Sequence, residues 1–121
     1  MTTPSGHTEA IQASRVIGTN VYNTAGESIG TIEDIMLEKT SNGIMFAVIG
    51  FGGFLGIGEK YHAVPWSVLD YDVYRGGYIV PYSREELEAA PAYSIEDLSR
   101  DDGMTARAAS YEYYRVDPYW S

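Results

Sequence analysis

The amino-acid sequence predicts a mostly β protein: a small β-barrel followed by short C-terminal helical segments and an aromatic tail. In the first two thirds of the chain, turn residues separate about five or six short apolar runs, a spacing typical of small barrels and sandwiches. After Tyr82 the pattern changes to short helical segments that begin with capping residues. The 121 residues, 45% of them apolar, suffice for one domain with a core.

Three turns divide the apolar runs, namely Asn23–Ser28, Thr40–Gly43 and Arg75–Gly77. The second contains an Asn-Gly pair, and these two residue types accept positive φ angles at low cost. The pair therefore predicts a two-residue hairpin turn. In the run before it, Ile29 and Ile35 do not share the alternation of Ile32, which predicts a β-bulge near Glu33–Asp34 or a strand that bends at a barrel corner.

The run Ile44–Phe51 is apolar on both faces. A small barrel buries only the inner face of a strand, so the outer face requires a second cover. A helix, the C-terminal tail or another subunit are the three candidates.

A glycine-rich stretch, Gly50–Trp66, follows that strand. It is not a Walker loop, because Glu59 separates Gly58 from Lys60, and it is not a dinucleotide-binding loop, because Leu55 stands at the third glycine position. We interpret it as a connection whose apolar residues fold back over one end of the barrel, with a proline at a strand end and a tryptophan as a large anchor. The residues to which we assign this structural role are Gly53, Phe54, Leu55, Gly58, Pro65 and Trp66.

Two capped helical segments follow. Ser83 and Glu86 form a capping box, and Pro91 stops the first segment. Ser94 caps the second segment, and Gly103 ends it. The last residues form an aromatic tail, which we expect to dock on the uncovered face of the strand Ile44–Phe51, in the same chain or in a partner. The docking residues are Tyr113, Tyr114, Tyr119 and Trp120.

Catalytic, metal-binding and cofactor-binding residues are not expected. The chain has no cysteine, which excludes disulfides and thiolate sites. His7 and His62 lie far apart in the sequence, and a zinc site needs three or four convergent ligands. No G-x-S-x-G motif is present.

The net charge of −9 disfavours nucleic acid as a partner, because the few lysines and arginines are scattered. No apolar run is long enough to insert in a membrane, and the polar N-terminus is not a secretory signal, so we expect a cytoplasmic protein. Residues 83–102 carry seven acidic and two basic side chains. This stretch is either a solvated face or an electrostatic surface for a basic partner.

The stretch "GGFLGIGEKYHAVPW" resembles the hallmark of the PRC-barrel family, and "IGTNVYNTAGESIGTIEDIMLEKTSNGIMFAVIGFGG" resembles its first hairpins. The "AAPAY" segment is similar to that of stand-alone bacterial members. The resemblance implies a PRC-type barrel over residues 14–93, with a flexible N-terminus (1–13) and a helical segment with the aromatic tail (94–121).

The family includes the cytoplasmic part of the photosynthetic reaction-centre H subunit and the C-terminal domain of a ribosome-maturation factor. It has no shared catalytic residues, and the resemblance implies a barrel that binds proteins. We therefore predict a non-enzymatic interaction or scaffold module that forms a homodimer. The alternatives are a regulatory subunit of a membrane photosynthetic or electron-transfer complex and, more remotely, a small enzyme.

Overall fold

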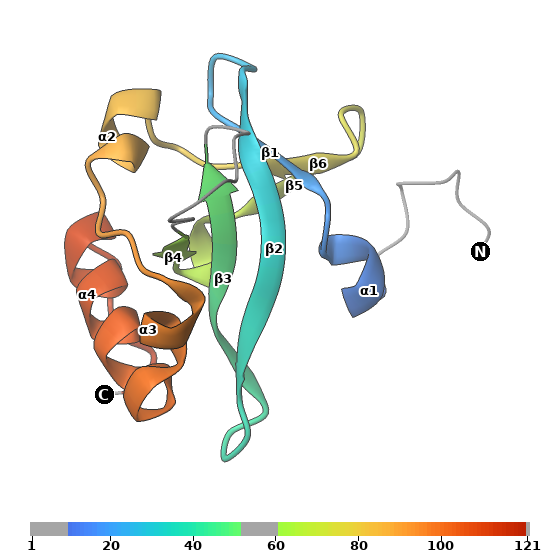
Figure 1. Ribbon diagram of the computed structural model, residues 1–121. Coiled ribbons are helices and arrows are strands. Elements are labelled where there is room, and N and C mark those ends of the chain that lie inside the picture. Colours follow the sequence, from blue (N-terminus) through green and yellow to red (C-terminus); the bar gives the residue numbers. More distant parts are fainter. Residues whose placement is uncertain (1–9, 52–60, 121) are drawn as a thin grey trace.

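The computed structural model describes residues 10–51 and 61–120, in which a six-stranded sheet carries the C-terminal helices along one side (Figure 1). The predicted fold class, a small barrel-like β fold with short C-terminal helices, is confirmed. The sheet has the strand order β4-β3-β2-β1-β6-β5. The strands are β1 (Asn20–Tyr22), β2 (Ser28–Glu38), β3 (Gly43–Phe51), β4 (His62–Val64), β5 (Asp70–Asp72) and β6 (Gly77–Ile79).

The two edge strands are close in the sequence. β4 ends at Val64, directly before Pro65, and the short 3-10 helix η1 (Trp66–Val68) leads to β5 at the other edge. β1 and β6 pair in parallel, whereas the other strand pairs are antiparallel. A short connection between opposite edges requires the sheet to curl, as in a small barrel.

The long hairpin of β2 and β3 contains two bulges. Ile32 pairs with Ile49 and Asp34 pairs with Val48, which leaves Glu33 as the extra residue. The predicted bulge near Glu33–Asp34 is therefore confirmed. The second bulge lies in β3, where Met45 is the extra residue between two paired positions. A bulge bends its strand and increases the local twist, which fits the curvature of this sheet.

The turn between β2 and β3 differs from the prediction. Glu38 pairs with Gly43, so the connection has four residues, 39–42, and of these Asn42 has a positive φ of 60°. Ser41 explains the wider turn: its hydroxyl donates to the Glu38 carboxylate (2.6 Å) and accepts from the Gly43 backbone N–H (3.2 Å). A side chain that bridges the turn in this way competes with the tighter two-residue form.

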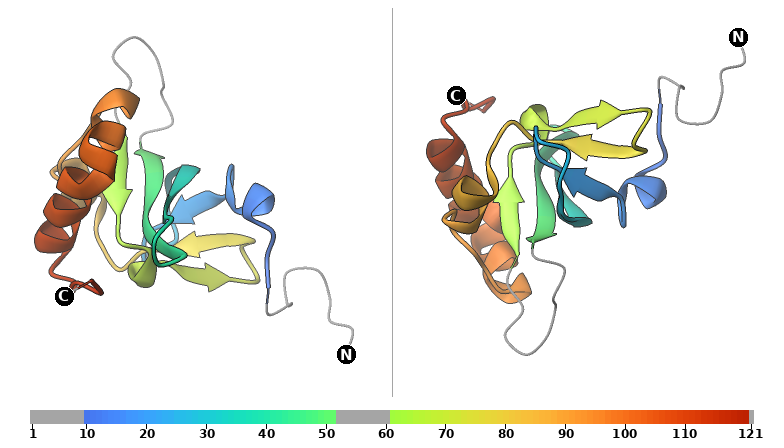
Figure 2. Two further views of the ribbon diagram at one scale, coloured as in Figure 1. Left: turned by 90° about the horizontal axis from the view of Figure 1, so that it is seen from below. Right: turned by 90° about the horizontal axis from the view of Figure 1, so that it is seen from above.

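Both faces of β3 are covered within the chain. Ala47 and Ile49 belong to the larger core cluster, which also contains Val16 of α1 (Ala13–Val16). Phe46 and Val48 belong to a second cluster that includes residues of the C-terminal helices. Both views of Figure 2 show these helices beside β4 and β3, away from the β5–β6 hairpin.

Two of the C-terminal helices begin as predicted. Ser83 caps α2 (Arg84–Glu88) in a complete capping box with Glu86. Ser94 caps α3 (Ile95–Ser99) by accepting from the Asp97 backbone N–H (3.2 Å). Leu87 of α2 and Leu98 of α3 are both buried in the core. Each short helix is therefore held by one cap and one apolar anchor.

The first aromatic residues of the expected tail belong to a helix. The 3-10 turn η2 (Arg100–Gly103) leads to α4 (Met104–Tyr114), which carries Tyr111, Tyr113 and Tyr114. Gly103, predicted to end the second helical segment, is the last residue of η2 and has φ 79°; it is also the N-cap of α4. The alanines of the segment favour a helix, and Ala106 packs in the second core cluster. None of the helices in residues 10–51 and 61–120 has the length and hydropathy of a membrane-spanning segment.

Candidate interaction site

Three segments meet where α2 lies beside the C-terminal end of α4. The connection after β6 supplies one tyrosine, α2 supplies a glutamate, and the end of α4 supplies two tyrosines and an arginine. Together they line an open cavity of about 390 Å³, which we call the tyrosine pocket. Its residues are Tyr82, Glu86, Tyr113, Tyr114 and Arg115.

The pocket forms where α4 ends. Arg115 adopts the left-handed conformation with φ 57°, and its backbone N–H donates to the Glu112 carbonyl oxygen (3.2 Å). Helices commonly end with a residue in this conformation, and that residue is usually glycine. The chain turns away from the helix at this point, immediately after the two tyrosines.

The aromatic walls are held by ring contacts. Tyr113 and Tyr114 have ring centroids 4.9 Å apart at an interplanar angle of 87°. Tyr82 packs on the same Tyr114 ring, with centroids 4.6 Å apart and an angle of 39°. These are the offset and edge-to-face geometries that aromatic pairs prefer. Tyr114 is thus the central ring, and its two neighbours come from different segments.

Two of the three phenol groups use their hydrogen atoms within the protein. The Tyr113 hydroxyl donates to the Glu86 backbone carbonyl oxygen (2.6 Å), which ties α4 to α2. The Tyr82 hydroxyl donates to the Tyr114 carbonyl oxygen in a longer bond (3.5 Å). The Glu86 carboxylate, through Oε1, accepts from the Ser83 backbone N–H (2.9 Å). Its Oε2 atom takes no part in that cap.

The Tyr114 hydroxyl is buried, and among the described residues it has no hydrogen-bond partner. Only 7% of the surface of Tyr114 is exposed. Burial raises the pKa of this phenol well above its ordinary value, and Tyr113, Tyr82 and Glu86 raise the pKa further. A buried polar group without a partner costs free energy, so this hydroxyl lowers the stability of the fold at this position.

The pocket carries one charge of each sign. Among the described residues, Arg75, Arg84, Arg100 and Arg107 each form an ion pair. The Arg115 side chain, by contrast, forms no ion pair in this part of the chain and is exposed at the pocket. Glu86 is also exposed. The Glu86 carboxylate and the Arg115 guanidinium therefore have opposite effects on the affinity for a charged ligand: one attracts it and the other repels it.

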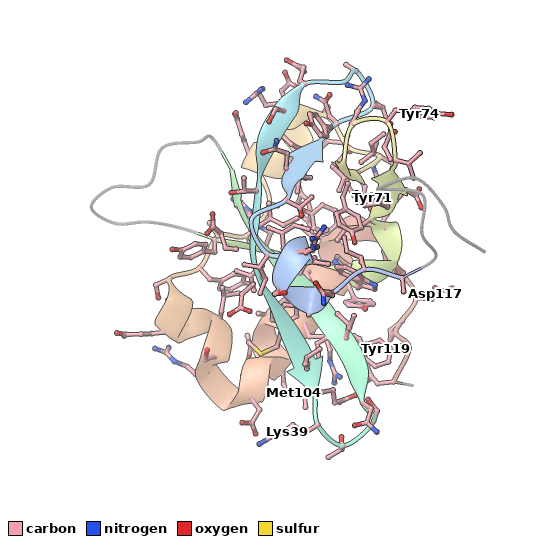
Figure 3. The ribbon with its side chains drawn as sticks, turned by 90° about the vertical axis from the view of Figure 1, so that its right-hand side faces the viewer. Lys39, Tyr71, Tyr74, Met104, Asp117 and Tyr119 are labelled. Carbon is pink, nitrogen blue, oxygen red and sulfur yellow. The ribbon has the colours of Figure 1, made fainter. Side chains whose placement is uncertain are left out.

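A second group of side chains, the arginine cluster, surrounds the buried Arg107. Its guanidinium donates to the Glu38 carboxylate and to the Tyr119 hydroxyl, each at 3.1 Å, and lies 3.8 Å from the centroid of the Trp120 ring. Tyr111 contacts the rings of both C-terminal aromatics. Figure 3 shows Tyr119 in the same half of the molecule as Lys39 of the hairpin turn, far from Tyr74. The cluster holds the C-terminal segment against α4 and β2.

The sequence-predicted residues lie at separate places. Tyr113 and Tyr114 line the tyrosine pocket, and Tyr119 and Trp120 belong to the arginine cluster. Trp66 is half-buried against the core and packs on Tyr78 with ring centroids 5.6 Å apart. Pro65 is fully buried. The predictions for Gly53, Phe54, Leu55 and Gly58 lie outside the described residues.

Sequence reasoning missed Tyr82, Arg107 and Arg115, and it assigned Glu86 only a capping role. No periodicity links Tyr113 to Glu86, which lie 27 positions apart, or Arg107 to Glu38, which lie 69 apart. The available signals were local: a tyrosine directly before a capping box and an arginine directly after a tyrosine pair. Neither signal indicates a shared site without the packing of α2 on α4.

The buried His62 on β4 is the other titratable group of note. Burial lowers its pKa, and a hydrogen bond with the backbone of Pro91 raises it by less. Within residues 10–51 and 61–120, no three or more His, Asp or Glu side chains gather at one point. His62 is thus a core residue of the strand.

Comparison with known proteins gives a family match and a structural likeness. The family model described as PRC-barrel domain matches residues 8–87. A crystal structure of RimM from Pseudomonas aeruginosa, described as a 16S ribosomal RNA processing protein, is similar at 15% identity and a TM-score of 0.41. The similarity covers 69% of this chain and 50% of that one, so the chain spans about half the length of the RimM protein. No curated protein matches the sequence.

Proposed function

Because the chain belongs to the PRC-barrel family, we propose that it is a non-enzymatic protein-interaction module whose partner binds at the tyrosine pocket. The observation that carries the proposal is the open cavity of about 390 Å³, which three tyrosines, a glutamate and an arginine line. Tyrosine and arginine are the residue types enriched at the energetic centres of protein interfaces.

The hydrogen bonds of the pocket support recognition rather than catalysis. The phenol hydrogens of Tyr82 and Tyr113 are held by backbone carbonyl oxygens. Such bonds fix the rings in place, which lowers the entropy cost of binding a partner. A second copy of the chain and a protein of a membrane electron-transfer complex are the two partners that the proposal includes.

Site-specific photocrosslinking in the native host tests the proposal. A photoreactive phenylalanine derivative replaces Tyr113 at the pocket or, as the matched control, Tyr74 on the turn between β5 and β6, where 90% of the side chain is exposed. We expect a discrete adduct from position 113 that is absent at position 74 and is lost when Tyr82→Ala is added.

The mass of the adduct identifies the partner class. An adduct of twice 13.4 kDa indicates a second copy, and a different mass indicates another protein. Adducts that are the same at both positions, or that survive Tyr82→Ala, would contradict the proposal. No adduct from position 113 would contradict it as well.

A further inference from the structure

We propose that the tyrosine pocket binds the ammonium or guanidinium group of a lysine or arginine side chain on the protein partner. This inference deepens the proposed function and rests on it. Three properties of the pocket carry it: the ring faces, the kind of hydrogen-bonding capacity that remains, and the carboxylate.

The rings form a corner suited to a cation. Tyr113 and Tyr114 are almost perpendicular, with centroids 4.9 Å apart, and Tyr82 packs on Tyr114 at 4.6 Å. An aromatic face is the negative part of the ring, and a cation within about 6 Å of the centroid is attracted to it. A group that enters the corner lies close to more than one ring. The aliphatic stem of a lysine or arginine also packs well on such rings.

Apart from the Arg115 guanidinium, the remaining hydrogen-bonding groups of the pocket are acceptors. Tyr82 and Tyr113 have already donated their hydroxyl hydrogens, so these two oxygens offer only lone pairs. Glu86 contributes carboxylate oxygen Oε2, which the capping box does not use. Lysine and arginine side chains are donors without acceptors, so they match these groups better than a carboxylate does.

The charges around the pocket favour a basic partner. The chain has a net charge of −9, and α2 contributes three glutamates and one arginine, which pairs with Glu27. Such a surface attracts a basic segment and repels an acidic one. The acidic stretch 83–102, left open between a solvated face and a surface for a basic partner, supplies the glutamates of α2.

The positive charge of Arg115 repels a cation in the same pocket, so Glu86 and Arg115 should have opposite effects on the affinity. Glu86 and Arg115 line one cavity with opposite charges. For a cationic ligand, neutralising Glu86 weakens binding and neutralising Arg115 strengthens it. For an anionic ligand both signs reverse. The pair of variants therefore reports the charge of the group that binds.

Titration with small probes, followed by the NMR signals of the tyrosine rings, measures this directly. The probes are the acetyl-amides of lysine and arginine, with norleucine as the neutral control and glutamate as the anionic control. We expect the two basic probes to shift the signals of Tyr113 and Tyr114 in a salt-sensitive way. The norleucine and glutamate probes should leave them unchanged up to the same concentration.

The variants are chosen to keep the fold. Glu86→Gln retains a side chain that serves in a capping box, so α2 should persist, and it should weaken binding of the basic probes about fivefold. Glu85→Gln removes an equal charge one residue away, outside the pocket lining, and should change binding little. Arg115→Gln should strengthen binding by a similar factor. Tyr113→Leu, which removes a wall, should abolish the shifts.

Several outcomes would overturn the inference: binding of the glutamate probe in place of the basic ones, reversed signs for Glu86→Gln and Arg115→Gln, equal effects of Glu85→Gln and Glu86→Gln, or no shift with any probe. The crosslinking experiment at position 113 is independent of these titration outcomes. A crosslink without cation binding would uphold the interaction module and reject its ligand chemistry. Cation binding without a crosslink would reject the proposed function.

Discussion

At the scale of single residues, two buried tyrosines of α4 differ in what their hydroxyl groups contact. The Tyr111 hydroxyl donates to the Met45 carbonyl oxygen (3.2 Å), whereas the Tyr114 hydroxyl has no partner among the described residues. Both side chains are at most 7% exposed. Burial is therefore comparable, and the hydrogen bond is the difference between them.

The matched substitutions Tyr111→Phe and Tyr114→Phe should change stability in opposite directions. Tyr111→Phe leaves a buried carbonyl without its donor and should lower the free energy of unfolding by about 1–2 kcal/mol. Tyr114→Phe removes an unpartnered hydroxyl and should raise it by about 1 kcal/mol. Urea unfolding of both variants beside the wild type measures the difference. Equal losses would show that the Tyr114 hydroxyl has a stabilising contact.

Glu38 should make stability depend on acidic pH. The hydrogen bond from the Ser41 hydroxyl is the main cause that lowers its pKa below 4.5; burial opposes this, and Arg107 and Tyr119 lower the pKa further. A carboxylate with a depressed pKa contributes stability above its unfolded-state pKa. That contribution is lost as the pH falls through the lower folded-state value.

Glu38→Gln should therefore flatten the loss of stability on acidification below about pH 4.5, and Ser41→Ala should flatten it in part. Urea unfolding across a pH series shows the slopes. Parallel profiles for the wild type and Glu38→Gln would contradict this assignment.

At the scale of elements, the parallel pairing of β1 with β6 depends on the absence of a side chain at one position. A Cβ atom at Gly77 would lie 2.5 Å from the Asn20 carbonyl oxygen and 2.9 Å from a ring carbon of Tyr22. Both contacts are shorter than atoms tolerate, and one of them is to backbone. The two strands approach this closely because Gly77 has no side chain.

Gly77→Ala should lower the free energy of unfolding by about 2–4 kcal/mol, because β1 and β6 must move apart. Gly76→Ala is the matched control: its Cβ would meet no atom within 4 Å, although φ is 67°. The backbone conformation alone should then cost about 1 kcal/mol. Chemical denaturation compares the two variants. A Gly77→Ala cost no larger than that of Gly76→Ala would show that the strands separate easily.

For the molecule as a whole, the question of self-association depends on which segments bury the outer face of β3. From the sequence, a face of β3 that a barrel leaves open favours a homodimer. Leu98 of α3 and Ala106 of α4 share a core cluster with Phe46 and Val48, so this face is buried within one chain. Leu37 remains 61% exposed on β2 and is available to a second copy.

The homodimer stays a prediction, now with Leu37 as a contact to test. Sedimentation equilibrium at micromolar concentration should give a mass above 13.4 kDa, and Leu37→Arg should lower it because a buried charge would be costly at an interface. A single species of 13.4 kDa for the wild type would contradict self-association.

Features that depend on neighbouring residues follow from the amino-acid sequence alone. The bulge at Glu33 follows from a slip in apolar alternation, and the starts of α2 and α3 follow from serines with acidic residues three positions later. The family resemblance added the barrel, in agreement with the match over residues 8–87. Gly103 ends the second helical segment as the last residue of η2, as predicted, but the sequence reasoning did not predict α4, which begins directly after it.

The cover of β3 and the grouping of side chains into a site depend on how the whole chain packs. The tyrosine pocket requires Glu86 and Tyr113, 27 positions apart, and the arginine cluster requires Glu38 and Arg107, 69 positions apart. Sequence periodicity reports which face of an element is apolar, but it does not report which other element that face meets. That choice depends on the packing of the whole chain, because the same apolar or aromatic face gains a similar free energy against any partner that excludes water.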